Sequence, residues 1–314
     1  MPRYRDSLPQ LDGRPVLTDG GLETVLVFQE GLDLPHFASF VVLDDEAGRT
    51  LLARYLDAYT AIALRHGAGL LLESTTWRAS PDWVARVTGA ASDTPAVNER
   101  AIEFLSSYRD EQPADIPMPI SGCVGPRGDG YVPDSGMTAD QAAEYHRTQI
   151  EALAATDADL ISALTLNYVE EAIGVARAAA SAGVPSAISF TVETDGRLPT
   201  GQPLGDAIQQ VDEETDAAPA YYMINCAHPA HFADTLDPSA PWAARLKGLR
   251  ANASMLSHAE LEEATELDEG DPADLGRRMA DLRQRLAGLS VVGGCCGTDH
   301  RHLAAIADRC FGAP

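Results

Sequence analysis

Three cysteines have the type and the spacing to carry chemistry. Cys295 and Cys296 stand side by side in the segment VVGGCCGT, and Cys226 follows the apolar segment YYMIN about 70 residues earlier. A disulfide between neighbouring residues would strain the peptide that joins them, so we do not expect one. Three thiolates suit Zn²⁺, because soft sulfur ligands select it and three protein ligands leave a fourth position open. We expect the flanking glycines to let the backbone turn tightly enough for both side chains to face one ion.

Such a centre favours one type of reaction. Zinc stabilises a bound thiolate and so lowers the pKa of a thiol substrate. Since three cysteine thiolates already make the centre negative, a fourth sulfur would keep much of its electron density, which suits alkyl transfer to a thiol better than activation of water. Two other interpretations stay open: the cysteines are buried small apolar residues, or they form a redox switch. His228 and His231, in CAHPAHF, are expected to lie outside the ligand set.

The elements that must position these cysteines alternate along the chain. Short apolar runs are followed by turns and then by alanine-rich helical patterns, which predicts a parallel sheet. The eight predicted strands are Pro15–Asp19, Gly69–Glu73, Pro119–Cys123, Asp159–Ala163, Ser186–Thr191, Tyr221–Asn225, Gly248–Asn252 and Leu289–Gly293. With this count and a length of 314 residues, we predict an α/β fold, a single (β/α)8 TIM barrel forming one domain over residues 1–314. No GxGxxG motif follows the first run, which argues against a dinucleotide-binding fold.

The spacing of apolar residues predicts helices between these strands. The predicted helices are Ala47–His66, Thr138–Ala154, Tyr168–Ala182 and Asp274–Ala287, with a further helix opening at Ser257. Thr138 and Gln141 have the spacing of a capping box, and Gly183 is placed to end the third of these helices. In a barrel, functional residues lie at the carboxyl ends of the strands. Cys226 would then follow the sixth strand and the cysteine pair the eighth, so the three thiols should meet at one mouth of the barrel.

Composition excludes several classes of function. The formal net charge of −24 would repel a phosphate backbone, so we expect no nucleic-acid partner. There is no run of about 18 apolar residues that would predict a membrane span. The amino-terminal segment is polar, without the apolar core of a signal peptide, and five cysteines in no small-scaffold pattern favour a reducing compartment. We therefore expect a cytoplasmic protein; nothing in the sequence indicates its oligomeric state.

Several segments together resemble a known family. MINCAHP and VVGGCCGTDHRHL are similar to the zinc signature of the homocysteine S-methyltransferase family, and TDGGLET, SGCVGPRGDGY and SFTVETDGRLPTGQPL match it as well. The resemblance covers nearly the whole chain. It implies a TIM barrel that binds zinc through Cys226, Cys295 and Cys296 and methylates the thiolate of homocysteine to give methionine. The donors that it implies are S-methylmethionine, S-adenosylmethionine, betaine, or methylfolate through cobalamin.

The resemblance also implies substrate contacts. Asp19, in the DGG turn, would lie near the amino group of homocysteine, and Asn225 would shape the pocket beside Cys226. The family has a glutamate on the fourth strand that holds this amino group, whereas the aligned residue here is Leu164, which cannot pair with an ammonium. Either Glu73, at the end of the second strand, or Glu193, in TVETDG, would supply the charge, or the acceptor is not homocysteine.

The sequence thus predicts a zinc-dependent thiol S-methyltransferase, with homocysteine as the expected acceptor and no catalytic residue beyond the zinc site. One alternative is a related enzyme acting on another thiol or selenol. Another is a zinc- or thiol-sensing barrel without turnover. Because no cobalamin or folate module accompanies the barrel, we expect a small-molecule methyl donor. Cys123 and Cys310 are expected to be pocket-wall or core residues.

Overall fold

Parallel strands form the centre of the molecule. A computed structural model of the chain describes residues 1–113, 115–133 and 136–312. The strands pair in parallel throughout, in the order β2-β1-β9-β8-β7-β6-β5-β4-β3. Their bounds are β1 Val16–Leu17, β2 Gly69–Leu70, β3 Leu72–Glu73, β4 Ile120–Val124, β5 Leu160–Leu166, β6 Ser186–Phe190, β7 Tyr221–Asn225, β8 Leu246–Ala251 and β9 Val291–Gly294.

The two ends of this sheet belong to one run of chain. β2 and β3 are separated only by Leu71, and β2 pairs with β1 while β3 pairs with β4. The amides alternate between the two neighbours: Leu71 N donates to Leu17 O, and Leu72 N donates to Pro119 O. The run Gly69–Glu73 therefore acts as one strand that closes the barrel between β1 and β4. Counted in this way the barrel has eight strands, and the prediction of a (β/α)8 barrel is confirmed.

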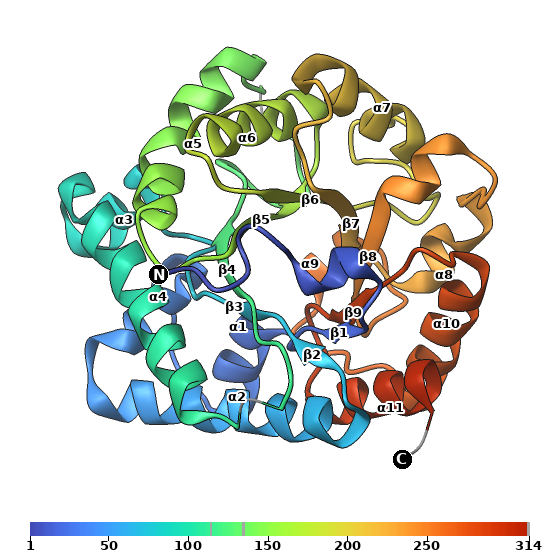
Figure 1. Ribbon diagram of the computed structural model, residues 1–314, viewed down its shortest axis with the longest axis horizontal. Coiled ribbons are helices and arrows are strands. Elements are labelled where there is room, and N and C mark those ends of the chain that lie inside the picture. Colours follow the sequence, from blue (N-terminus) through green and yellow to red (C-terminus); the bar gives the residue numbers. More distant parts are fainter. Residues whose placement is uncertain (114, 134–135, 313–314) are drawn as a thin grey trace.

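Helices surround the barrel (Figure 1). Their bounds are α1 Leu22–Thr24, α2 Glu46–His66, α3 Pro81–Thr88, α4 Thr94–Glu111, α5 Ala139–Ala154, α6 Val169–Ser181, α7 Leu204–Thr215, α8 Pro229–Phe232, α9 His258–Glu263, α10 Pro272–Arg285 and α11 His300–Phe311. Thr138 forms the predicted capping box with Gln141, and Ser257 forms another with Glu260. The element boundaries differ from the expected ones by a few residues: β5 runs on to Leu166, and β8 starts at Leu246.

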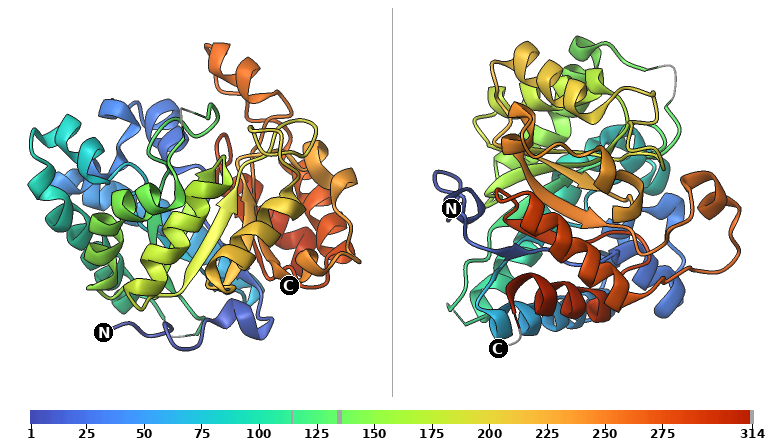
Figure 2. Two further views of the ribbon diagram at one scale, coloured as in Figure 1. Left: turned by 90° about the horizontal axis from the view of Figure 1, so that it is seen from above. Right: turned by 90° about the vertical axis from the view of Figure 1, so that its right-hand side faces the viewer.

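The two mouths of the barrel are covered differently. The amino-terminal segment crosses one mouth, where Leu8 is buried and Gln10 donates a hydrogen bond from Nε2 to the hydroxyl of Tyr221. Leu8 packs there in a cluster with inward-facing strand residues such as Val16 and Leu160. Figure 2 shows α9 standing at the opposite mouth, to which the carboxyl ends of the strands lead. The first mouth is closed by apolar packing, which leaves the second for a site.

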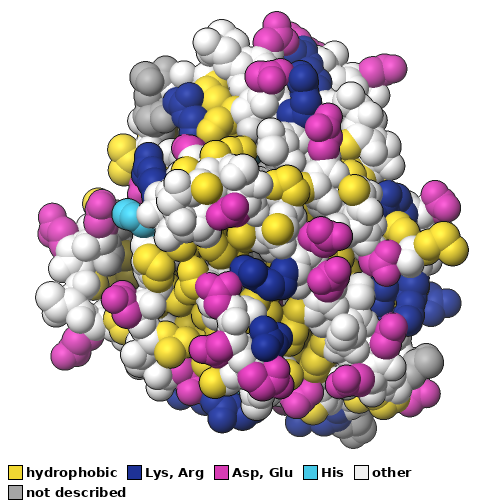
Figure 3. Space-filling model, turned by 90° about the vertical axis from the view of Figure 1, so that its left-hand side faces the viewer, with side chains coloured by type: hydrophobic (Ala, Val, Ile, Leu, Met, Phe, Trp, Pro, Cys, Tyr) yellow, Lys and Arg dark blue, Asp and Glu magenta, His cyan; other side chains and the backbone are white. Residues whose placement is uncertain are grey.

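Acidic and basic side chains lie side by side on the face of the molecule that Figure 3 displays. Figure 3 shows Asp and Glu side chains scattered over the face that it displays, with Arg and Lys side chains among them. None of the described helices combines the length and the apolar character that crossing a bilayer requires. On this face the acidic and basic side chains are therefore mixed rather than gathered into one patch.

Candidate metal centre

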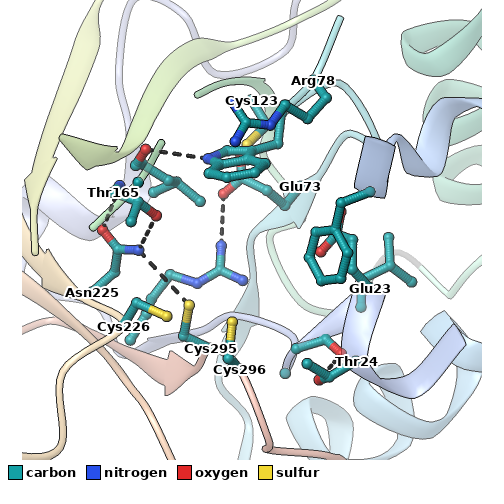
Figure 4. Close-up of a pocket in the computed structure, with 18 of the residues that line it drawn as sticks. Glu23, Thr24, Glu73, Arg78, Cys123, Thr165, Asn225, Cys226, Cys295 and Cys296 are labelled. Carbon is teal, nitrogen blue, oxygen red and sulfur yellow. Dashed lines mark hydrogen bonds and ion pairs between the residues drawn. The ribbon is translucent and has the colours of Figure 1, made fainter. Parts of the chain in front are cut away.

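The structure brings the three predicted cysteines together. Cys226 directly follows β7, and Cys295 and Cys296 directly follow β9. Their sulfur atoms lie within 4.8 Å of one another, and this is the group of side chains in the described chain that can hold a metal ion. Figure 4 shows them side by side at the bottom of a cavity. All three cysteines are free thiols in this structure.

The backbone at Cys226 is held in an uncommon conformation. Its φ of 55° lies in the left-handed region, which costs a residue with a side chain free energy that its surroundings must supply. Cys226 N donates to Arg250 O at 3.0 Å, and Cys226 O accepts from Nε2 of His258 at 2.8 Å. The other ring nitrogen of His258 pairs with Glu193 at 3.1 Å. These contacts fix the turn that aims the thiol away from the β7 strand and toward the cysteine pair.

The glycines around the cysteine pair allow neighbouring segments of the chain to pack closely against it. A Cβ at Gly294 would lie 2.0 Å from Thr298 Oγ1, and one at Gly21 would lie 2.6 Å from Cys295 O. The DGG turn after β1 therefore packs directly on the CCGT turn after β9, and Gly21 N donates to Thr298 O. Of the glycines flanking the pair, Gly297 has positive φ, at 75°. The expected tight turn thus depends on Gly297, while Gly294 makes room for the side chain of Thr298 and Gly21 for the backbone of Cys295.

Each sulfur atom has a polar neighbour. The Tyr131 hydroxyl lies 2.9 Å from Cys226 Sγ and 3.7 Å from Cys296 Sγ, while Asn225 Nδ2 lies 3.7 Å from Cys295 Sγ. The Tyr131 ring stacks on His258 with 4.2 Å between centroids, which fixes its position. Hydroxyl and amide donors stabilise thiolates in preference to thiols. The environment therefore fits sulfur ligands in their charged form.

The three thiols divide their protons unequally. Hydrogen bonds from Cys226 and Cys296 hold the pKa of Cys295 well below the usual thiol range. Hydrogen bonding to Cys295 raises the pKa of Cys226, and hydrogen bonding to Cys226 raises the pKa of Cys296. The lowered pKa of Cys295 favours its thiolate form, to which a cation would be drawn.

Asn225 organises the wall beside the thiols. Its Oδ1 accepts from Thr165 N at 2.8 Å and from Ser189 Oγ at 2.6 Å, and its Nδ2 donates to Thr165 Oγ1 at 2.8 Å. Thr165 has φ 63°, an outlier for a β-branched residue, at the point where the pairing of β5 with β6 shifts register. One amide therefore holds a strained residue and reaches a thiol, which places Asn225 as a positioning residue.

The thiols open into a cavity of about 370 Å³. Asp19, Glu73 and Asn225, three of the residues expected to contact substrate, line it together with the cysteines. Leu164, Trp77 and Phe37 give it apolar walls, and Cys123 is a buried wall residue, as predicted. The structure does not bring Glu193 into this lining; its carboxylate lies behind the Cys226 turn, against His258.

A buried arginine joins the two carboxylates. Arg250, on β8, donates from Nη2 to Asp19 Oδ1 at 2.5 Å and from Nη1 to Glu73 Oε2 at 2.9 Å. Tyr55 donates to the other oxygen of Asp19 at 3.1 Å. Burial raises the pKa of Asp19 and brings the pKa of Glu73 to about 7, while the positive charge of Arg250 opposes both shifts. The two expected acids are therefore one ion-paired cluster, the Asp19–Arg250–Glu73 triad.

Sequence reasoning missed several residues of the site. Arg250 had a signal, because a lone arginine inside an apolar strand (GLRAN) requires buried partners. Tyr131 lies in a loop segment, GDGY, in which nothing marks it as a neighbour of a thiol. Glu23 also lines the cavity, where burial raises the pKa of its carboxyl group and Ser39 donates to it at 2.7 Å.

A second cavity of about 280 Å³ borders the cluster from the side of α9. It shares Cys296, Tyr131, Asp129 and Thr24 with the first cavity. Its lining also contains three further carboxylates (Glu262, Glu266, Asp268) and, among the described residues, no lysine or arginine. The thiol cluster is therefore accessible from two sides of different character.

Comparison with known proteins agrees with this geometry. A family model described as homocysteine S-methyltransferase matches residues 16–310. Betaine–homocysteine S-methyltransferase 1 of Rattus norvegicus is 24% identical over 234 residues, which cover 68% of this chain and 53% of the relative. Homocysteine S-methyltransferase 4 of Zea mays is 26% identical over 211 residues, covering 64% of this chain and 60% of the relative. The chain thus spans just over half the length of these curated relatives.

Solved structures share the fold. The homocysteine methyltransferase MmuM from Escherichia coli superposes with a TM-score of 0.71 in its oxidized form, at 22% identity, over 94% of this chain and 96% of that one. Its metallated form gives a TM-score of 0.69 at 21% identity, over 95% of this chain and 98% of that one. These likenesses establish the barrel architecture over nearly the whole chain.

Proposed function

The chain belongs to the homocysteine S-methyltransferase family, and from this premise we propose that it is a zinc-dependent thiol S-methyltransferase. It transfers a methyl group from a small donor to homocysteine and so produces methionine, with residues 1–314 acting as one catalytic domain. The observation that carries the proposal is the convergence of three thiols from the ends of β7 and β9 on one point of the cavity. Free thiols at the centre suit the reducing cytoplasm, where we place the protein.

Cys226, Cys295 and Cys296 would hold the ion. The donor set is three soft sulfurs within 4.8 Å of one another, with hydroxyl and amide donors directed at them, which is the chemistry that zinc selects. When bound, zinc would stabilise the acceptor sulfur as a thiolate at neutral pH. The role of the surrounding residues is to orient the thiols: Asn225 and Tyr131 by hydrogen bonds, and His258 by holding the carbonyl of Cys226.

The first cavity would bind the acceptor. Its apolar walls, Leu164 and Trp77, suit the methylene groups of homocysteine, and Glu73 offers a carboxylate for the amino group. Glu73 thereby takes over the task that the strand-four glutamate has in the family. The apolar side chains beside the acceptor sulfur would reduce its contact with water, which favours a strong nucleophile.

The second cavity supports a small cationic donor. Its four carboxylates (Asp129, Glu262, Glu266, Asp268) and the ring of Tyr131 suit a sulfonium or quaternary ammonium group. With the acceptor in the first cavity and the donor in the second, both ligands approach the cluster from different sides at Cys296. The acceptor sulfur would attack the donor methyl directly: the new S–CH3 bond forms as the bond to the onium atom breaks, and the donor leaves with that electron pair.

The test is a methyl-transfer assay on zinc-loaded protein, with homocysteine and a panel of sulfonium and quaternary ammonium donors. We expect methionine with at least one donor, together with about one zinc ion per chain by plasma emission spectrometry. Transfer to another thiol or selenol, but not to homocysteine, would assign a different acceptor. Bound zinc without methyl transfer to any acceptor from any donor would instead identify a zinc- or thiol-sensing barrel.

A further inference from the structure

The guanidinium of Arg250 is the central charge of the first cavity. It is 4% exposed, lines the cavity, and is bonded to the carboxylates of both Asp19 and Glu73. The other cation of the described lining, Arg78, lies between two indole rings, 4.2 Å from that of Trp77 and 4.1 Å from that of Trp83. Its Nη1 is committed to the carbonyls of a nearby loop. Arg250 is therefore the cation of this lining that is held between two of its carboxylates, whereas Arg78 is held between indole rings.

The Asp19–Arg250–Glu73 triad keeps unused hydrogen-bonding capacity. A guanidinium has five N–H groups, and within the described chain three of those of Arg250 have partners: Gly294 O, Glu73 Oε2 and Asp19 Oδ1. Glu73 Oε1 is buried and has no hydrogen-bond partner among the described residues. By contrast, both oxygens of Asp19 are engaged, one by Arg250 and one by Tyr55. Asp19 is therefore the partner that holds Arg250 in place, while Glu73 and Arg250 can still accept and donate.

The free oxygen of Glu73 and the free N–H groups of Arg250 lie side by side, so together they can bind a ligand that carries both a positive and a negative group. An ammonium group needs an anionic acceptor, and a carboxylate is bound best by two N–H groups of one guanidinium. A buried polar atom without a partner is costly, so a ligand that engages Glu73 Oε1 removes a penalty as well as adding a contact. Figure 4 shows Glu73 across the cavity from Cys295 and Cys296, so a ligand reaching both would lie with its sulfur at one end and its charges at the other.

We propose that Arg250 is a specificity-determining residue, which holds the carboxylate of the acceptor thiol while Glu73 holds its ammonium group. This inference rests on the proposed function and deepens it. The acceptor is an α-amino acid thiol, and its two charged groups bind to Glu73 on β3 and Arg250 on β8. Leu164 on β5 contributes an apolar wall alone. Glu73 and Arg250 together thus explain how the cavity can recognise an amino acid without a carboxylate on β5.

The test compares three thiols on zinc-loaded enzyme. Homocysteine carries both charges, 3-mercaptopropylamine lacks the carboxylate, and 4-mercaptobutanoate lacks the ammonium group. We expect removal of the carboxylate to lower kcat/KM on the order of 10²-fold, because a bidentate charge-assisted contact is lost. In Arg250→Met this preference for homocysteine over 3-mercaptopropylamine should disappear, mainly through KM. In Arg250→Lys it should be reduced, because the charge stays and the fork is lost.

A matched control separates recognition from the loss of an ion pair. Arg245, directly before the same strand, forms a comparable two-bond pair with Asp212 on α7, outside the cavity. Arg245→Met should keep the full preference for the carboxylate. Glu73→Gln should instead weaken discrimination against 4-mercaptobutanoate. An Arg250→Met or Arg250→Lys enzyme that prefers homocysteine as strongly as the unmodified protein would overturn the proposal.

Binding measurements keep this test independent of turnover. The affinities of the three thiols for the zinc-loaded protein can be measured by calorimetry without any donor. The same order of affinities, its weakening in Arg250→Lys and its loss in Arg250→Met support the role of Arg250 even if no donor yields methyl transfer, an outcome that would count against the proposed function alone. Equal affinities for homocysteine and 3-mercaptopropylamine in the unmodified protein would refute the role of Arg250.

Discussion

Both ends of this barrel contain a buried arginine paired with carboxylate, and the two pairs differ in what they leave unsatisfied. At the amino end, Arg109 pairs with Asp159 at 3.0 Å, and the same carboxylate accepts from Ile120 N and Tyr4 N. At the carboxyl end, Arg250 bridges Asp19 and Glu73, and one oxygen of Glu73 has no partner in the described chain. Arg109 also leaves its Nε without a partner, but it does not line the main cavity.

The difference teaches how to tell a structural ion pair from a binding one. Burial and ion pairing are alike at the two ends, so neither property marks function by itself. What distinguishes the carboxyl end is that Arg250 and Glu73 keep spare hydrogen-bonding capacity and line an open cavity next to a cluster of thiols. The amino end, where the Asp159 carboxylate ties the start of β5 to the amino-terminal segment, joins elements of the fold.

The largest effect is expected where the carboxyl end loses a thiol. Cys296→Ser should abolish zinc binding and methyl transfer, by more than about 100-fold, since even residues that only orient a metal ligand alter affinity by about 10–100-fold. Zinc content and activity check this on the purified variant. Cys310→Ser, a cysteine on α11 outside the cavity, should retain both. Full activity of the Cys296 variant without bound metal would remove the thiol cluster from the mechanism.

The next largest effect is expected at the amino end, where the Arg109–Asp159 ion pair should stabilise the fold without contributing to substrate recognition. Arg109→Met leaves the Asp159 carboxylate buried without its charge partner, which should lower the free energy of unfolding by about 3–5 kcal/mol. Urea unfolding measures this loss, and activity per folded molecule should be unchanged. If Arg109→Met altered the preference among acceptor thiols, the contrast between the two ends would be lost.

A pH series on Glu73 sharpens the contrast further. Burial raises the pKa of Glu73 to about 7 in the folded protein from 4.5, so ionisation of this group lowers stability as pH rises between these values. The full shift corresponds to at most about 3 kcal/mol. Glu73→Gln lacks this ionisation, so its stability relative to the unmodified protein should increase from about pH 4.5 to about pH 7. Parallel stability curves for the two proteins would contradict the buried, under-satisfied state of this carboxyl group.

The smallest effect concerns the hydrogen bonds that hold Asn225 beside the thiols. Ser189→Ala removes the hydroxyl that donates to Asn225 Oδ1, while Thr165 N keeps its bond to the same oxygen. We expect a loss of about 1 kcal/mol in unfolding free energy, the usual contribution of one hydrogen bond. Zinc content should not change, because Asn225 keeps its bonds to Thr165. A large drop in zinc content would show that Ser189 is needed to hold the thiols.

Rare residue types and regular spacing explain what was predictable. The run Gly69–Glu73 and the strands before Cys226 and Cys295 could be recognised because each is a short apolar run before a turn. Cysteine is uncommon, so two positions at strand ends were enough to indicate a thiol cluster. The roles of Asp19 and Glu73 were harder, because carboxylates are common and their partner Arg250 is 231 residues from one and 177 from the other.

The amino-acid sequence by itself determined the barrel and the three thiols. Local hydrophobic periodicity specifies strands and helices, and parallel alternation forces the strand ends, with their cysteines, to one mouth. Only the tertiary structure decided that Arg250 joins Asp19 to Glu73, that Glu193 lies behind the Cys226 turn, and that Tyr131 reaches a sulfur. The physical reason is that barrel closure brings distant strands into contact, and the pairing of common charged groups depends on which of them share a buried space.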